Sequence, residues 1–186
     1  MRGINRFLQP VAKSYSSFSE QVQSGNTCVF VSYKGNDKDA ARAIANALMA
    51  AGIDVYFDEN DAMLTAANIA GRHAEVVDFI EKGVEKSSHI LAVISERTKG
   101  SWWVSFEIGS GRRKKCQIAY VALQDVQNLP SYLMIAHQIT SDRSLYRWIR
   151  DSLPHTVEKS VNFSESSVSI PNLPIQDRAI PFTTSP

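Results

Sequence analysis

Short apolar runs recur along the chain, separated by longer segments in which apolar residues follow a helical period. The apolar runs are residues 27–33, 53–57, 89–95, 116–123 and 133–140. Runs that are apolar at nearly every position are typical of strands buried on both faces of a parallel sheet. The pattern therefore predicts five strands, the last of them short.

The segments between these runs predict amphipathic helices. In the first of them Ala40, Ile44 and Leu48 fall on one face, as in a helix that covers a sheet. The predicted helices lie within residues 36–52, 74–87, 101–115 and 142–153. Side chains that can accept hydrogen bonds at their N-termini belong to Asn36 or Asp37, Ser101 and Asp142, which we predict as N-caps.

Strands that alternate with helices indicate an α/β domain with a parallel sheet and helices on both faces. Right-handed crossovers leave few arrangements, and we expect a flavodoxin-like three-layer fold with a five-stranded parallel sheet. The domain should cover residues 27–153. Residues 1–26 then form an N-terminal extension, and residues 154–186, rich in Ser and Pro, form a C-terminal tail.

Composition narrows the classes of function. The chain has 186 residues, 44% of them hydrophobic, and a net charge of +1, so no global charge favours nucleic acid or a membrane surface. No apolar run reaches the roughly 18 residues that span a bilayer. The N-terminus lacks the apolar core of a signal peptide. With only two cysteines, Cys28 and Cys116, both in apolar runs, a reduced cytoplasmic setting is expected.

Ligands of an open α/β sheet bind outside the carboxyl ends of the strands, so the loops after the strands are the candidate site. Residues 33–37 (YKGND) open a helix, where backbone N–H groups favour anions and Lys34 adds positive charge. The alternative is a simple capped turn, since neither a Walker loop nor a GxGxxG motif is present. The long loop 58–73 carries Asp58, Glu59 and Asp61, which could bind a cation or remain solvated charges.

Glu107 lies in the helical segment GSWWVSFEIGSGRRKK, residues 100–115. It shares a face with Trp103, four residues earlier, and has no Lys or Arg at helical spacing to form an ion pair. From spacing alone a solvated surface charge remains the more ordinary interpretation. The basic run 112–115 is either a set of cations suited to the helix C-terminus or a phosphate-binding patch.

Two motifs, correctly ordered, resemble the TIR (Toll/interleukin-1 receptor-like) family over residues 27–153. VFVSYKGND, residues 29–37, is similar to the family's first box, especially in its plant form. SWWVSFE, residues 101–107, matches the S-x-W-x-x-x-E pattern of enzymatic TIR domains. The loop 58–73 occupies the position of the family's BB loop, but the expected Gly-x-x-Ile ahead of the second helix is not clear.

The resemblance implies an enzyme that cleaves the nicotinamide–ribose bond of NAD, as a glycohydrolase or ADP-ribosyl cyclase. Glu107 would be catalytic, and Tyr33, Lys34, Ser101 and Trp103 would bind substrate. NAD would be the substrate, with no cofactor or metal. The product would be ADP-ribose or a cyclic or conjugated messenger, and bacterial stand-alone TIR proteins of this kind often serve antiphage systems such as Thoeris, with a separate effector protein.

Two other classes of function remain open. A non-enzymatic TIR adaptor would act by TIR–TIR assembly, and it need not keep the S-x-W-x-x-x-E pattern. A nucleoside deoxyribosyltransferase-like enzyme has a related fold and a glutamate nucleophile, but the motif at residues 32–37 speaks against it.

Overall fold

The computed structural model describes residues 3–6, 27–57, 70–152, 175–177 and 179–182. Most of the predicted N-terminal extension, the loop residues 58–69 and most of the predicted tail lie outside these ranges. The acidic residues Asp58, Glu59 and Asp61 therefore lie outside the described residues. Within the described ranges, no group of three or more His, Cys, Asp or Glu side chains could hold a metal ion.

Five parallel strands form one sheet in the order β2-β1-β3-β4-β5. The strands are β1 (Cys28–Ser32), β2 (Asp54–Tyr56), β3 (His89–Ile94), β4 (Gln117–Ala122) and β5 (His137–Ile139). The sequence steps from β1 out to β2 and then back past β1 to β3. This order confirms the predicted flavodoxin-like sheet, with β1 and β3 at the switch point where ligands bind.

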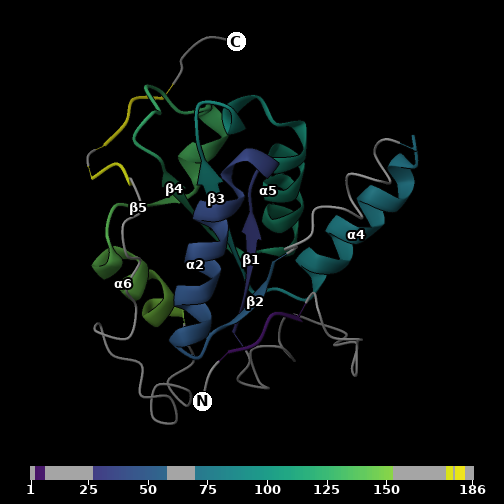
Figure 1. Ribbon diagram of the computed structural model, residues 1–186, viewed down its shortest axis with the longest axis horizontal. Coiled ribbons are helices and arrows are strands. Elements are labelled where there is room, and N and C mark those ends of the chain that lie inside the picture. The colour runs from purple at the N-terminus through teal and green to yellow at the C-terminus, as the bar shows by residue number, and fades with distance from the viewer. Residues whose placement is uncertain (1–2, 7–26, 58–69, 153–174, 178, 183–186) are drawn as a thin grey trace.

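Helices cover both faces of the sheet (Figure 1). The α-helices are α2 (Lys38–Ala50), α4 (His73–Glu85), α5 (Trp102–Lys114) and α6 (Asp142–Ser152), and the short 3-10 turns are η2 (Gly35–Asp37), η3 (Thr98–Gly100) and η4 (Ser131–Ile135). Helices α2 and α6 pack against Val29 and Val31, whereas α4 and α5 pack against Cys28 and Phe30. Alternate residues of one strand thus belong to two separate cores, as the apolar runs predicted.

The N-caps differ from the prediction at two helices. Ser101 caps α5 as expected, because its side chain accepts a hydrogen bond from the Val104 N–H. At α6 the predicted cap Asp142 is wrong. The Ser144 N–H donates to Ser141 Oγ at 3.2 Å, and the Ser141 N–H donates to Ser144 Oγ at 2.9 Å. This reciprocal pair closes the helix start one residue earlier.

At α2, Asp37 occupies the N-cap position but makes no side-chain cap hydrogen bond. Neighbouring Asn36 lies within the η2 turn. The predicted capping by either side chain is therefore wrong, and the Asp37 carboxylate is used elsewhere in the fold.

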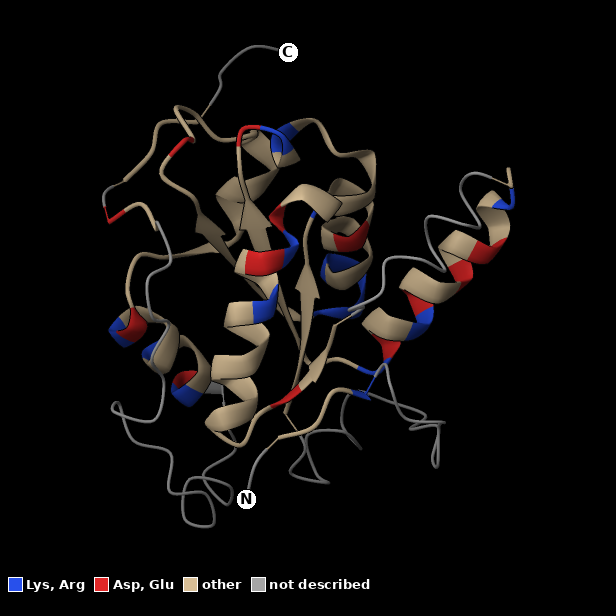
Figure 2. Ribbon diagram, viewed as in Figure 1, with Lys and Arg blue, Asp and Glu red and all other residues tan. Residues whose placement is uncertain are grey.

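The basic run at the end of α5 secures a neighbouring helix. Lys114 Nζ donates to the carbonyl oxygens of Val84 and Ser87, each at 2.9 Å, and to that of Glu85. These carbonyls lie at the C-terminal end of α4, where unpaired acceptors and the helix dipole favour a cation. The ammonium joins the ends of the two helices on this face. Figure 2 shows acidic and basic residues interspersed along α4 and α6, with mostly uncharged strands between the layers.

The described part of the C-terminal tail lies across the domain. The Gln176 N–H donates to the Ala122 carbonyl at 2.8 Å, and its side-chain amide donates to the carbonyls of Gln124 and Val126. Further along, the Leu129 N–H donates to the Pro181 carbonyl at 2.9 Å. These contacts place Gln176 and Pro181 against the loop that follows β4.

Both cysteines are buried and unbridged. Burial raises the pKa of the Cys28 thiol to about 11 and also raises the pKa of Cys116, so both remain protonated near neutral pH. Within the described ranges, every helix is too short or too polar to cross a membrane.

His89 begins β3 and is 3% exposed. Its Nδ1 lies 2.8 Å from Ser88 Oγ, and its ring meets Trp148 edge-on at 5.0 Å, while Nε2 has no hydrogen-bond partner among the residues that the structure describes. Burial lowers the pKa of this imidazole from 6.5 to about 4. The native state therefore keeps His89 neutral over a range of pH in which the unfolded chain binds a proton.

We predict that this difference destabilises the protein in mild acid. Above pH 6.5 both states hold a neutral His89, but as the pH falls from 6.5 to 4 only the unfolded state gains the proton. The free energy of unfolding should then fall by up to about 3 kcal/mol more in the wild type than in His89→Leu. Urea unfolding at a series of pH values measures this, and parallel pH profiles for the two proteins would contradict it.

Candidate functional site

Glu107 lies in the buried stripe of α5. The buried residues of this helix are Val104, Glu107, Ile108 and Gly111, spaced as the sheet-facing side of a helix. Glu107 is 7% exposed, so the surface-charge interpretation is wrong. Gly111 lets the helix come close to β3, because a Cβ atom there would lie 2.0 Å from Ile90 Cδ1.

Ser32 holds the Glu107 carboxylate at the carboxyl end of β1. Its Oγ donates a hydrogen bond to Glu107 Oε2. Ser32 faces α5 because it follows Cys28 and Phe30 at two-residue spacing and so lies on the same side of the sheet, which α4 and α5 cover. A hydroxyl donor compensates part of the cost of removing a carboxylate from water. The hydrogen bond thus fixes a buried carboxylate beside the switch point of the sheet.

Across the sheet from Ser32, the small side chain of Ala92 occupies the neighbouring register position, and Tyr120 follows it on β4. All three positions belong to the face covered by α5. Tyr120 is buried, and burial raises the pKa of its phenol. Ser32, Ala92 and Tyr120 thus form a row across three strands, with a hydroxyl, a small side chain and an aromatic ring on the side of the sheet where the Glu107 carboxylate lies.

The first loop, residues 33–37, is anchored at several points. The Tyr33 ring lies 5.3 Å from the Phe57 ring, and Lys34 Nζ donates to the Arg97 carbonyl at 3.2 Å. Asp37, which is buried, accepts hydrogen bonds from Ser95 Oγ at 2.6 Å and from Thr98 Oγ1. This explains why Asp37 does not cap α2. Its carboxylate ties the loop after β1 to the loop after β3.

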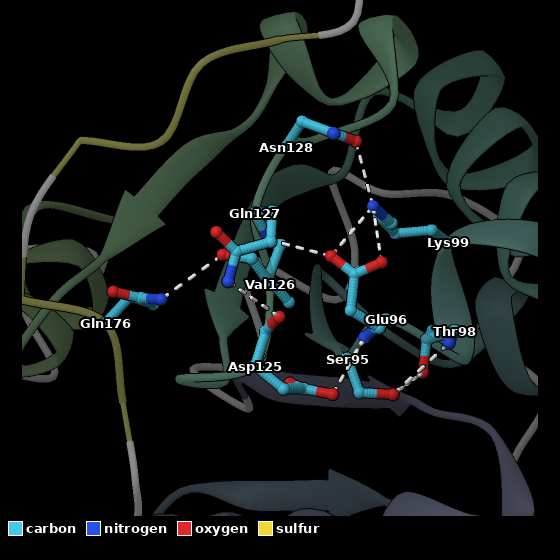
Figure 3. Close-up of polar contacts among 9 residues, drawn as sticks. All are labelled: Ser95, Glu96, Thr98, Lys99, Asp125, Val126, Gln127, Asn128 and Gln176. Atoms are coloured by element: carbon cyan, nitrogen blue, oxygen red, sulfur yellow. Dashed lines mark hydrogen bonds and ion pairs between the residues drawn. The ribbon is translucent and has the colours of Figure 1, made fainter.

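The loop after β3 is in turn joined to the loop after β4 (Figure 3). Glu96 accepts hydrogen bonds from Lys99 Nζ at 2.8 Å and from the Gln127 N–H at 2.7 Å. These two donors, Lys99 first, hold the pKa of the Glu96 carboxyl below its usual value. Lys99 also donates to Asn128 Oδ1, and the Glu96 N–H donates to Asp125 Oδ2. The loops after β1, β3 and β4 therefore form one connected rim at the carboxyl edge of the sheet, which we call the loop rim.

Ser101 and Trp103 lie at the start of α5, on the approach to Glu107. Ser101 Oγ is engaged in capping, with the Val104 N–H 3.4 Å away, and its contact with substrate remains a prediction. Trp103 is half-buried and meets the Phe106 ring edge-on at 6.2 Å. The neighbouring Trp102 is 90% exposed, so only Trp103 of the pair lies against the fold.

A separate pocket of about 660 Å³ lies between β5, α6 and the C-terminal end of α5. Its lining includes Arg112, His137, Arg147 and Trp148. None of the predicted site residues lines it. Glu107 and the loop rim therefore form the candidate site.

Of the predicted residues, Glu107 is brought against β1, Tyr33 and Lys34 directly follow Ser32, and Trp103 lies one helical turn before Glu107. Sequence reasoning missed Ser32 and the clamp formed by Asp37. The signal for Ser32 was the strand alternation, and the signal for Glu107 was its place in the stripe of Val104, Ile108 and Gly111. No comparable sequence pattern predicted that Ser95 and Thr98 would bind Asp37.

The protein is thus an α/β domain of the flavodoxin-like class. Its candidate site is a buried glutamate, surrounded by polar loops, at the switch point of the sheet. Residues 29–149 match the TIR domain family. This range is more than half of the chain, and the protein belongs to that family. TIR domains include enzymes that cleave NAD, and they commonly self-associate. A comparison with curated proteins returned no match to the chain.

We predict that Ser32→Ala destabilises the fold through Glu107. The variant leaves the buried carboxylate with one hydroxyl donor fewer, which should lower the free energy of unfolding by about 1 to 3 kcal/mol. In a Glu107→Gln background the same substitution should cost less, since no buried charge then needs the donor. Chemical denaturation of the four proteins in this cycle measures the coupling. Ser110→Ala, on the half-buried side of the same helix, is the control, and additive costs in the cycle would contradict the prediction.

Proposed function

We propose that this TIR protein cleaves the bond between nicotinamide and ribose in NAD, with Glu107 as the catalytic residue. The observation that carries the proposal is the burial of Glu107 at the ligand edge, with Ser32 Oγ donating to its carboxylate. A carboxylate held in a nearly water-free position interacts strongly with a positive charge that develops beside it. Loss of nicotinamide develops such a charge on the ribose.

The reaction requires few other catalytic groups from the protein. Nicotinamide leaves as a neutral base, so no general acid is needed, and the positive charge of the oxocarbenium-like transition state falls on the ribose ring. The Glu107 carboxylate stabilises that charge and accepts hydrogen bonds from ribose hydroxyls. Water then attacks the ribose cation and loses a proton to solvent to give ADP-ribose. Alternatively, a nucleophilic group of the substrate itself attacks to give a cyclic product, which exclusion of water from the site would favour.

The remaining predicted residues surround this centre in the proposal. Trp103 shapes the pocket for the leaving group and limits its water. Tyr33 and Lys34 stand on the first loop, where the N-terminal turn of η2 and α2 and a lysine charge suit the pyrophosphate. Ser101, at the N-cap of α5, would contact the substrate as it enters the same site. Lys34 is exposed, and its bond to the Arg97 carbonyl would be exchanged for a phosphate oxygen.

We further propose a cytoplasmic, Thoeris-like antiphage role, in which self-association through TIR–TIR contacts activates the enzyme. The product, linear, cyclic or conjugated ADP-ribose, would act on a separate effector protein. The support for this part is the family resemblance of the two motifs, which is an analogy of family and fold rather than of site geometry.

We predict that purified protein releases nicotinamide from NAD and that Glu107→Gln lowers the rate by about 10²- to 10³-fold. Glutamine keeps the size of the side chain and an oxygen that can accept from Ser32, but it carries no charge to stabilise the ribose cation. Nicotinamide release is measured by chromatography, and mass spectrometry identifies the second product. Glu81→Gln, on α4, is the matched control and should retain the wild-type rate.

The assay is made over a range of protein concentrations, so that assembly-dependent activity is seen. Equal rates in the wild type and Glu107→Gln would remove Glu107 from catalysis. Absence of turnover at every concentration would favour the adaptor function, in which TIR–TIR contacts rather than chemistry transmit the signal.

A further inference from the structure

Residues 3–6 form an additional segment along the outer edge of β2, which we call the edge segment (Figure 1). The Val55 N–H donates to the Ile4 carbonyl at 2.9 Å, and Asn5 pairs with Val55 as a parallel bridge. The Gly3 N–H donates to the Met49 carbonyl at the end of α2 at 2.8 Å. The edge of the sheet is therefore occupied by a part of the chain that precedes the matched TIR region.

The edge segment approaches the strand very closely at Gly3. A Cβ atom at this position would lie 2.0 Å from the Ile53 carbonyl oxygen, and the other closest atoms also belong to the Ile53 backbone, so no flexible side chain is there to move aside. Only glycine fits this contact. Substitution of Gly3 would thus displace the segment without altering any side chain that it presents to the sheet.

Of the residues in the edge segment, Asn5 makes the contact that leads toward the candidate site, through the backbone of Phe57. Its Nδ2 donates to the Phe57 carbonyl at 2.8 Å, and its Oδ1 accepts from the Phe57 N–H at 3.2 Å. The side-chain amide satisfies both backbone groups of Phe57, as a paired strand would. Asn5 is 8% exposed, so water does not substitute readily for either bond.

A second clamp aligns Asn5. Arg6 Nε and Nη2 donate to Asp54 Oδ2 at 2.9 and 2.8 Å, and the Ile4 N–H donates to Asp54 Oδ1 at 3.0 Å. Both side chains of this ion pair are largely buried, with 15% and 20% of their surfaces exposed. Asn5 is therefore fixed between two residues that are themselves held to β2.

Phe57 connects this segment to the first loop. Its ring is fully buried and lies 5.3 Å from the Tyr33 ring. Tyr33 directly follows Ser32, the donor to Glu107. We infer that Asn5 is a positioning residue for the site, acting through Phe57 to set the place of Tyr33. The inference rests on the proposed NAD-cleaving function and extends its site to a segment outside the matched TIR region.

Asn5 acts on binding rather than on bond cleavage. Its contacts lead to the Tyr33 side of the site, whereas Glu107 accepts a hydrogen bond from Ser32 and lies on the buried side of α5. Loss of the Asn5 amide should therefore raise KM for NAD by at least about fivefold and leave kcat within about twofold. A residue that served folding alone would lower the amount of active enzyme without this split.

The test uses the full chain with Asn5→Ala and Gly3→Ala, which disrupt the edge segment in different ways. Ile4→Ala is the matched control, because the Ile4 side chain is 41% exposed and only its backbone bonds to the sheet. Steady-state NAD kinetics give KM and kcat. Hydrogen exchange at the Phe57 amide and the NMR shifts of the Tyr33 ring report the positioning without any need for turnover.

We expect both disrupting variants to speed exchange at Phe57, shift the Tyr33 resonances and raise KM, and we expect the control to do none of these. Asn5→Asp would set a second acceptor against the Phe57 carbonyl in a buried position, so it should disturb Phe57 and Tyr33 at least as much as Asn5→Ala. Gly3→Ala, which leaves the Asn5 amide unchanged, serves if Asn5→Ala fails to fold.

The outcomes separate the two proposals. Wild-type kinetics in both disrupting variants, in a protein whose turnover depends on Glu107, would overturn the inference alone. If turnover does not depend on Glu107, the proposed function fails instead. In that case unchanged Tyr33 resonances in both variants would overturn the inference as well, and shifted ones would support the connection from Asn5 to Tyr33.

Discussion

The hydrogen bond from Ser32 to Glu107 is the constraint on which the site depends. A carboxylate that is 7% exposed is unfavourable unless donors replace its lost water. The end of β1 supplies one donor, and α5 must approach the sheet closely enough to receive it. Gly111 permits that approach, since any larger residue would meet Ile90. The polar contact at the edge of the sheet thus adds to the apolar packing of Val104 and Ile108 that holds this helix against the strands.

Polar side chains also connect the surrounding loops to one another. Asp37 joins the first loop to the third, and Glu96 with Lys99 joins the third loop to the fourth. The tail residue Gln176 closes the last of these loops by bonding its carbonyl groups. Polar side chains that would otherwise be solvated are used to hold backbone segments together. Such a rim can present loop residues to a ligand with little ordering cost on binding.

The sequence was sufficient for the fold because β1, β3 and β4 are apolar at almost every position and α2 and α4 have clear apolar stripes. The order of strands then followed from chain connectivity.

The residues of the candidate site were harder to predict from the sequence. Motif resemblance pointed to Glu107, although spacing alone favoured a surface charge. The pairing with Ser32 joins residues 75 positions apart, and a local pattern does not contain it. The role of Asp37 was misjudged because a helix N-terminus is where a local rule places an acidic residue, whereas long-range hydroxyl donors from Ser95 and Thr98 competed successfully for it.

The distant contacts of residues 3–6 were likewise invisible in the sequence, since only the folded edge of β2 brings Asn5 beside Phe57. Because residues 3–6 have no helical or strand periodicity, the sequence predicts that they belong to an extension outside the domain. Here its backbone and one amide side chain complete the hydrogen bonding of a short strand. Domain boundaries drawn from periodicity alone would leave that edge of the sheet uncovered.

The burial of both thiols has a practical consequence for labelling the molecule. Cys28 is 1% and Cys116 is 8% exposed, and burial raises the pKa of each. Alkylating reagents attack the thiolate, so neither native cysteine of the folded protein competes for a maleimide dye near neutral pH. A single cysteine introduced at an exposed site would then be the position that reacts. Spectroscopic probes of the loop rim can be attached in this way without first removing a core residue.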